Sequence, residues 1–263
     1  MTVRISLKND NLDALGAQFA MAPLERPVFL NSVPKCGTHL IRNIARMFVA
    51  PHQQHKTDFI QHGILHLHRR AFDAAAPLLS WGHLFFSDVA AVWLRDVHHV
   101  VMVRDPYDWV LARTRFFLSD QFQGNLNNIK NNAAHIEDVM NLMIFGALEK
   151  APPLADIYNM NAVAWMGTRA HIVRYEDLVA HLKALDTPEA EAYFRDLVVA
   201  KMGITTWPDD WRERVRLGSD RQHSATAREH LRHDVIVPEE LPDMQKRLVE
   251  YHAPGLRALL GYA

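Results

Sequence analysis

The sequence has a single cysteine, Cys36, among its 263 residues. An internal disulfide is therefore excluded, and the chain fits a reducing compartment. Long apolar runs are missing as well, because the nearest approach, residues 142–148, is far shorter than the ~18 residues of a membrane span. The N-terminal stretch MTVRISLKNDNLDALG lacks the apolar core of a signal peptide. We therefore expect a cytoplasmic protein without a membrane span.

Neither sign of charge is in excess, since 29 lysines and arginines face 30 aspartates and glutamates, for a net charge of −1. Overall charge thus gives no reason to expect nucleic acid or a membrane surface as a partner, and any anion site must be local. No low-complexity linker or internal repeat divides the chain, and 49% of its residues are hydrophobic. We predict a single domain over residues 1–263. Both a monomer and a homodimer remain open.

Histidine is abundant, with 16 residues scattered along the chain. The densest group, between His52 and His68, lacks cysteine or acidic partners at the compact spacing of a metal site. We therefore predict a solvated helical face in this region and no metal ion.

A strand, a tight loop and an amphipathic helix are predicted in direct succession over residues 28–49. The apolar run 28–30 suits a strand that is buried on both faces, and Pro34 and Gly37 mark the loop. The helix is indicated by apolar residues at helical spacing, namely Leu40, Ile41, Ile44, Met47 and Phe48.

This arrangement is typical of an anion site. The first N–H groups of a helix lack partners, and the helix dipole favours negative charge at the same place. Lys35 adds a full charge, Gly37 lets the backbone approach a ligand closely, and Thr38 adds a hydroxyl. The alternative is a structural turn with an exposed lysine.

A second unit of this kind is centred on Arg104. Residues 98–103, HHVVMV, form a continuous apolar run of the type found in parallel sheets. Asp105 is a suitable N-cap and Pro106 suits the first helical position, so a helix is predicted to begin at once. Arg104 then lies at the carboxyl end of the strand, where a guanidinium suits phosphate oxygens. A surface ion pair is the alternative role.

The remaining pattern completes an α/β fold with a central parallel sheet flanked by helices. Further strands are predicted at 78–83 and 170–173, and helices at 12–21, 87–94, 136–148, 154–165, 189–202 and 208–215. Three segments without clear periodicity, 51–70, 119–134 and 219–227, are interpreted as loops that border an acceptor site.

The loop PKCGTH, residues 34–39, resembles the PK[ST]GT[TH] loop of the sulfotransferases that use 3′-phosphoadenosine 5′-phosphosulfate (PAPS), in their bacterial, cytosolic-type form. The usual mononucleotide loop GxxxxGK[ST] is absent, because here the lysine precedes the glycine. VMVRDPYDW around Arg104 is similar to the family's second motif, and YEDL at 175–178 is similar to a third. The segment from Val215 resembles, more loosely, the family's C-terminal RxGxxGxW.

The resemblance implies a P-loop-like three-layer α/β fold and PAPS as co-substrate, with no metal. The acceptor would be a hydroxyl, or an amine, of a small molecule or glycan. The residues implied to bind the donor are Lys35, Cys36, Gly37, Thr38 and His39 at its phosphosulfate end, Tyr175 near the adenine, and Arg104, Arg216 and Gly218 at the 3′-phosphate.

Sulfuryl transfer needs a base for the nucleophile and a positive charge for the bridging phosphate oxygen. Lys35 is the candidate for that charge. An imidazole is the natural base near neutral pH. His83 follows a predicted strand and resembles the family's catalytic histidine in position, so we select it, with His39 as the second candidate. A histidine that merely caps a helix is the alternative role for His83.

Besides Cys36, which replaces the usual serine or threonine of the loop, three further positions depart from the family pattern. Leu40 stands where a tryptophan is common, Gly82 where a lysine is common, and Ala112 where a serine is common. The departures at Leu40 and Ala112 leave open a non-catalytic nucleotide-binding protein with a decayed donor site. A nucleotide-dependent kinase is the other alternative, but the serine or threonine that would hold Mg²⁺ directly after the loop lysine is replaced by Cys36.

Overall fold

The computed structural model describes the backbone of residues 4–5 and residues 10–56, 59–124, 126–130, 133–148, 150–223 and 236–262. Contacts divide the chain into two compact units. Unit 1 comprises Met1–Lys8, Arg104–Asn159 and Ala225–Ala263, and unit 2 comprises Asn9–Val103 and Met160–Ser224. The single domain expected from the sequence stays a prediction.

Unit 2 holds a five-stranded sheet in the order β3-β4-β2-β5-β7. Its strands are β2 (Val28–Ser32), β3 (Ile60–Gln61), β4 (Leu79–His83), β5 (His98–Val103) and β7 (His171–Arg174). Every pairing is parallel. The predicted parallel sheet is therefore confirmed, and β5 has the bounds expected from its apolar run.

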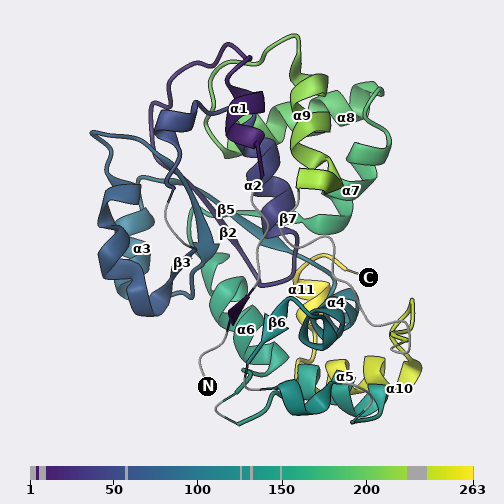
Figure 1. Ribbon diagram of the computed structural model, residues 1–263. Coiled ribbons are helices and arrows are strands. Elements are labelled where there is room, and N and C mark those ends of the chain that lie inside the picture. Colours follow the sequence, from purple (N-terminus) through teal and green to yellow (C-terminus); the bar gives the residue numbers. More distant parts are fainter. Residues whose placement is uncertain are drawn as a thin grey trace. The chain divides into compact units, whose positions relative to one another are not determined.

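Helices cover both faces of this sheet, which makes the three layers of an α/β fold. One face carries α1 (Leu12–Gly16), α2 (Thr38–Arg46), α7 (Tyr175–Lys183), α8 (Pro188–Arg195) with the π-helical η5 (Asp196–Lys201), and α9 (Trp211–Ser219). The other carries the 3₁₀ helices η2 (His62–Phe72) and η4 (Val163–Trp165), and α3 (Asp88–Leu94). In Figure 1, α3 lies on the opposite side of the sheet from α2 and α9.

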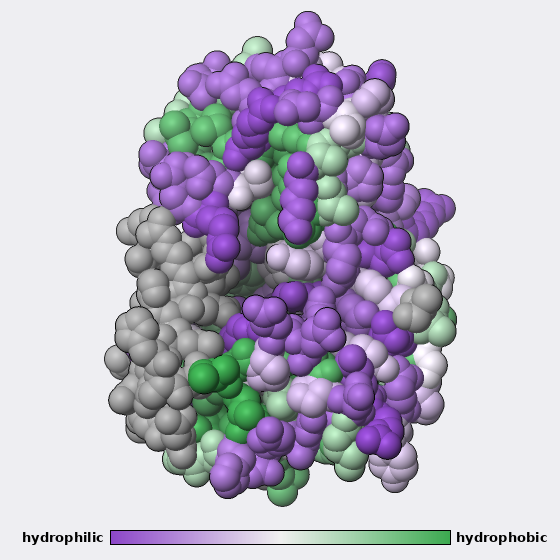
Figure 2. Space-filling view, turned by 90° about the vertical axis from the view of Figure 1, so that its right-hand side faces the viewer, coloured by the Kyte–Doolittle hydropathy of each residue, from purple (hydrophilic) through white to green (hydrophobic). Residues whose placement is uncertain are grey.

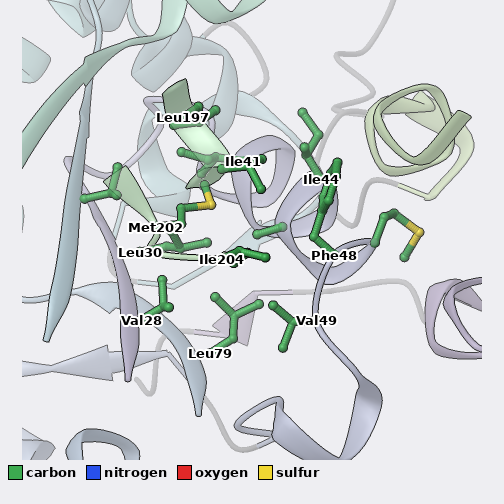
Figure 3. Packing of buried hydrophobic residues seen from close by; sticks show 14 of the residues in the cluster. Val28, Leu30, Ile41, Ile44, Phe48, Val49, Leu79, Leu197, Met202 and Ile204 are labelled. Carbon is green, nitrogen blue, oxygen red and sulfur yellow. The ribbon is translucent and has the colours of Figure 1, made fainter. Parts of the chain in front are cut away.

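Successive side chains of β2 pack against the helices on opposite faces of the sheet. Val28 and Leu30 are fully buried and belong to the same hydrophobic cluster as Ile41 and Ile44 of α2, with Val28 near Leu79 in Figure 3. Phe29 points to the other face, where its ring lies edge-on to Phe72 with centroids 5.5 Å apart. A central strand that is apolar on both faces is typical of a parallel sheet between helices.

Unit 1 consists mainly of helices. They are α4 (Pro106–Leu118), α5 (Ile136–Phe145), most of α6 (Leu154–Asn161), α10 (Asp243–His252) and α11 (Leu256–Leu259), with a short antiparallel pair of β1 (Arg4–Ile5) and β6 (Phe122–Gln123) and the 3₁₀ turn η3 (Asn127–Ile129). The predicted start of α4 is confirmed, because the Asp105 carboxylate accepts a 2.9 Å hydrogen bond from the Tyr107 N–H and Pro106 is the first helical residue.

Some boundaries differ from the prediction. The helix expected over 136–148 ends at Phe145, because Gly146 leaves the helical region with φ 79°. The helix expected from residue 208 begins only at Trp211. Residues 219–223 end α9 and form the 3₁₀ turn η6 (Arg221–His223), whereas the remainder of the expected loop 219–227 lies outside the described residues.

The segment 51–70 is more ordered than the loop that was expected. It contains the 3₁₀ turn η1 (Pro51–Gln53), β3 and most of η2. The predicted solvated face is confirmed for His62 and His66, which are exposed. It is wrong for His68, which is buried with its Nδ1 3.1 Å from Nε2 of His55.

No helix in the described ranges has the length and apolar character needed to cross a bilayer. Hydrophilic residues cover most of the described surface on the face shown in Figure 2, with smaller hydrophobic areas between them.

Candidate functional site

The loop between β2 and α2 turns through two residues with left-handed backbone, Lys35 at φ 69° and Gly37 at φ 93°. Alternating backbone conformations of this kind point successive N–H groups to one side and form an anion-binding concavity. The N–H groups of Gly37, Thr38 and His39 donate to no backbone carbonyl in the described part of the chain. The loop therefore presents donors at the N-terminus of α2, where the helix dipole also favours an anion.

Gly37 is required here for a second reason. A Cβ atom built on it would lie 2.6 Å from Cδ2 of Tyr175, the first residue of α7. The Tyr175 ring is thus packed directly against the loop. The structure brings together these two residues, which the sequence places far apart.

His83 is the last residue of β4, beside the end of β2. Its Nδ1 is 3.0 Å from the carbonyl oxygen of Ser32 and 3.2 Å from the Ser32 hydroxyl. A carbonyl can only accept, so Nδ1 donates the proton of that bond and Nε2 keeps its lone pair. Burial lowers the pKa of His83 to about 4, against the opposing effect of the Ser32 carbonyl. At neutral pH the imidazole is therefore an uncharged proton acceptor.

Ser32 links this histidine to the anion loop. Its hydroxyl lies 2.5 Å from the hydroxyl of Thr38, which is buried. The Thr38 hydroxyl is therefore held in place by its hydrogen bond with the Ser32 hydroxyl. Sequence reasoning missed Ser32, although its place as the last residue of β2, immediately before the loop, was an available signal.

Asn31 fixes the backbone that follows His83. Its side-chain amide donates to the Leu84 carbonyl at 3.0 Å and accepts from the Leu84 N–H at 2.9 Å. Its oxygen also accepts from the Ser32 N–H and from the amide of Asn161. Asn31 is only 1% exposed, so these bonds are shielded from water. His83 is thus held at its ring by Ser32 and at its C-terminal side by Asn31.

Phe59 lies between two imidazoles. Its ring is stacked on His83 with centroids 5.2 Å apart and an interplanar angle of 14°, and His39 meets it edge-on at 5.2 Å. Burial lowers the pKa of His39 to about 3, with a further contribution from the charge of Arg42. Both imidazoles are therefore neutral at pH 7. Phe59 falls within segment 51–70, which was expected to border the acceptor.

Two further predicted residues are Cys36, in the loop itself, and Arg104, in unit 1. Cys36 is fully buried within the loop. Arg104 belongs to unit 1, where its Nη2 is 3.9 Å from the Asp108 carboxylate and its carbonyl accepts from the Tyr158 hydroxyl.

The expected C-terminal phosphate residues both lie on α9. Arg216 is largely exposed and pairs with Asp186 at 2.6 Å. Gly218 faces α2, since a Cβ on it would lie 2.6 Å from the Ile44 Cα. The structure thus gives Gly218 a packing role between helices, and the 3′-phosphate role of this pair stays a prediction.

A central parallel strand, a left-handed loop and a helix that begins at the loop, in a sheet covered on both faces, define a P-loop-like three-layer α/β fold. No protein-family model matches the sequence, and no curated protein matches it. Among solved structures, the chain is similar to the crystal structure of mouse sulfotransferase SULT7A1 complexed with PAP. That match has a TM-score of 0.59 and 14% identity, and it covers 96% of this chain and 94% of the mouse chain. The likeness shows the fold that the two proteins share.

Proposed function

We propose that this protein is a PAPS-dependent sulfotransferase that transfers a sulfuryl group to a hydroxyl, or an amine, of a small molecule or glycan in the cytoplasm. The observation that carries the proposal is the arrangement of His83. Its Nε2 is left unprotonated by the bond from Nδ1 to the Ser32 carbonyl, on the strand that ends in the loop of Lys35. A base and a phosphate-type loop are thus built on neighbouring strands.

In the proposed reaction the acceptor oxygen forms a bond to sulfur while the bond from sulfur to the 5′-phosphate oxygen breaks. The acceptor proton passes to Nε2 of His83, and adenosine 3′,5′-bisphosphate (PAP) leaves. Lys35 and the N–H groups of Gly37, Thr38 and His39 neutralise the charge that develops on the bridging oxygen. Cys36 is a small residue of this loop. Tyr175 contacts the adenine, and Arg104, Arg216 and Gly218 serve the 3′-phosphate.

The comparison with known structures supports this reading. The mouse protein with the same fold is named a sulfotransferase, and its structure contains PAP. A kinase is less well supported, because Cys36 follows the loop lysine where a Mg²⁺-binding hydroxyl would be needed.

Two measurements test the proposal. Calorimetric titration should show that PAP binds more tightly than ATP with Mg²⁺, whereas the reverse order would favour a kinase. Transfer of labelled sulfate from PAPS should then fall by about 10²- to 10⁴-fold in His83→Ala, because a general base contributes that much. His66→Ala, which removes an exposed imidazole from unit 2, is the matched control. Lys35→Ala should weaken both PAP binding and transfer.

A non-catalytic nucleotide-binding protein gives a different result. It would bind PAP, and no acceptor would receive labelled sulfate from the wild-type protein. Undiminished turnover in His83→Ala would instead keep the transferase and remove His83 as its base.

A further inference from the structure

Arg42 lies on the same face of α2 as His39, one turn further along the helix. Its guanidinium carbon is 4.1 Å from the centre of the Trp81 ring. Trp81 precedes His83 by two residues on β4, so the two side chains leave the strand on the same face. The side chains therefore form two adjacent groups. In the first group, the Phe59 ring contacts the rings of His83 and His39. Trp81 and Arg42 form the second group, one step back along β4 from His83.

The next arginine of α2 shows what Arg42 lacks. Arg46 pairs with Asp10 and with Asp13, each at 2.8 Å, and its Nε donates to Gln54. By contrast, Arg42 makes no hydrogen bond or ion pair with any residue in the described ranges, and its Nε is buried without a partner. The interaction that stabilises the Arg42 charge is instead a cation–π contact with the face of the Trp81 ring.

Apart from the Trp81 contact, the charge on Arg42 is stabilised only at a distance, by the carboxylates of Asp10 and Asp13, which act to raise its pKa. Burial lowers the pKa of Arg42 to about 10, so the side chain remains protonated at neutral pH. His39 and His83 are neutral there, with pKa values of about 3 and about 4. The carboxylates of Asp10 and Asp13 are already bound by Arg46. Arg42 is therefore a largely buried cation beside His39, with no carboxylate bound to its guanidinium in the described ranges.

We propose that Arg42 binds an oxyanion carried by the acceptor, so that the preferred substrates are hydroxyl compounds with a carboxylate or sulfate group. This inference rests on the proposed sulfotransferase function. A guanidinium offers several N–H donors in one plane and suits two-point binding of such oxygens. With the oxyanion at Arg42 and the hydroxyl at His83, the acceptor would lie along the Phe59 ring. Arg42 is thus a specificity residue, distinct from Lys35, which serves the donor.

The test compares matched acceptors that differ in one charge. These are 4-hydroxyphenylacetate against 4-hydroxyphenylacetamide, and a glucoside sulfate ester against the unsulfated glucoside. We expect wild-type kcat/KM to be at least about tenfold higher for the anionic member of at least one pair. Arg42→Gln should remove that preference through a rise in KM, with kcat and the neutral acceptors changed less than threefold. Arg42→Lys should retain part of the preference.

The controls separate folding, donor binding and acceptor choice. Arg95→Gln removes an exposed arginine, 74% exposed at its side chain, from the opposite face of the sheet and should change nothing. PAP affinity and the unfolding temperature should be the same in Arg42→Gln and wild type. If Arg42→Gln does not fold, the comparison of Arg42→Lys with wild type on the same pairs decides.

Each contrary result has its own meaning. Loss of PAP binding by the wild-type protein would refute the proposed function itself. PAP binding together with equal use of charged and neutral acceptors, or an equal loss on both in Arg42→Gln, would overturn only the role of Arg42. Failure of every anionic acceptor while PAP binds would overturn it as well.

Discussion

His83 is oriented by a backbone carbonyl, and no carboxylate in the described residues takes that place. An imidazolium would gain no counterion from such a partner, and burial lowers the pKa of His83 to about 4. We therefore expect the base to stay unprotonated well below pH 6.5, so that kcat/KM retains more than half of its neutral value at pH 5. Initial rates of labelled sulfate transfer between pH 4.5 and 8 would measure this. An acid limb centred near pH 6.5 would contradict it.

Asn31 fixes the backbone on the C-terminal side of His83 through its two hydrogen bonds to Leu84. Replacing it by alanine leaves the Leu84 N–H and the Ser32 N–H without their side-chain acceptor in a buried place. Buried groups without partners are costly, so we expect Asn31→Ala to lower the free energy of unfolding by about 2 to 4 kcal/mol. Urea unfolding measures the change. Asn11→Ala is the control, because Asn11 is exposed and its side chain makes no cap bond, so its effect should stay within about 0.5 kcal/mol.

Individual residues differ in how far the sequence reveals them. Lys35 and Gly37 could be singled out from the loop that follows an apolar run, and His83 from its place after a predicted strand together with the family resemblance. The position of Ser32 before the loop was a signal available in the sequence, but its contact with His83, like the contact of Arg42 with Trp81, arises from neighbours that only the folded chain supplies. Ser32 meets His83 through the pairing of β2 with β4, and Arg42 meets Trp81 through the packing of α2 on β4.

The crossing of α2 and α9 depends on a glycine. A Cβ on Gly218 would lie 2.6 Å from the Ile44 Cα and 2.7 Å from the Asn43 carbonyl, both in the backbone of α2. The helices must therefore separate in Gly218→Ala, and we expect a loss of about 1 to 3 kcal/mol despite the higher helix propensity of alanine. Thermal and urea unfolding test this. Gly63→Ala is the control, because nothing lies within 4 Å of its added Cβ. A stabilised Gly218→Ala would refute the packing role.

At the scale of elements, long apolar runs were predicted well and short segments were not. β5 has the predicted bounds, and α4 begins at Pro106 as its capping residues indicated. β3 was missed because a strand of two residues has no measurable period. The position of β3 also explains why residue 82 is a glycine here, where the family pattern has a lysine. A Cβ on Gly82 would lie 2.1 Å from the Ile60 carbonyl oxygen, so the close approach of β3 excludes any side chain there.

At the scale of the molecule, three buried histidines couple stability to pH. Burial lowers the pKa values of His39, His83 and His99 to about 3, 4 and 3. In the unfolded chain these groups titrate near pH 6.5. Below that pH the unfolded state binds more protons than the folded state. The free energy of unfolding therefore decreases as the pH is lowered from 6.5 to the pKa of the folded state. The carboxylates of Asp10 and Asp13 act only at lower pH. Burial would raise their pKa values, but the hydrogen bonds and charge of Arg46 lower them below 3.8.

We therefore expect urea unfolding to show a lower free energy at pH 5 than at pH 7, with no loss between pH 7 and 8 from these groups. His99 is the clearest test, because it is only 4% exposed and packs edge-on against Trp165 at 4.6 Å. His99→Phe should reduce the loss between pH 7 and pH 5 by up to about 2 kcal/mol, because a group that is protonated only when unfolded contributes about 1.4 kcal/mol per pH unit below 6.5. Phe72→Leu, which weakens the same face of the sheet without removing a titrating group, should lower stability equally at both pH values. If the pH dependence of His99→Phe matched that of wild type, the pKa of His99 would be the same in the folded and the unfolded protein, and burial would not lower it.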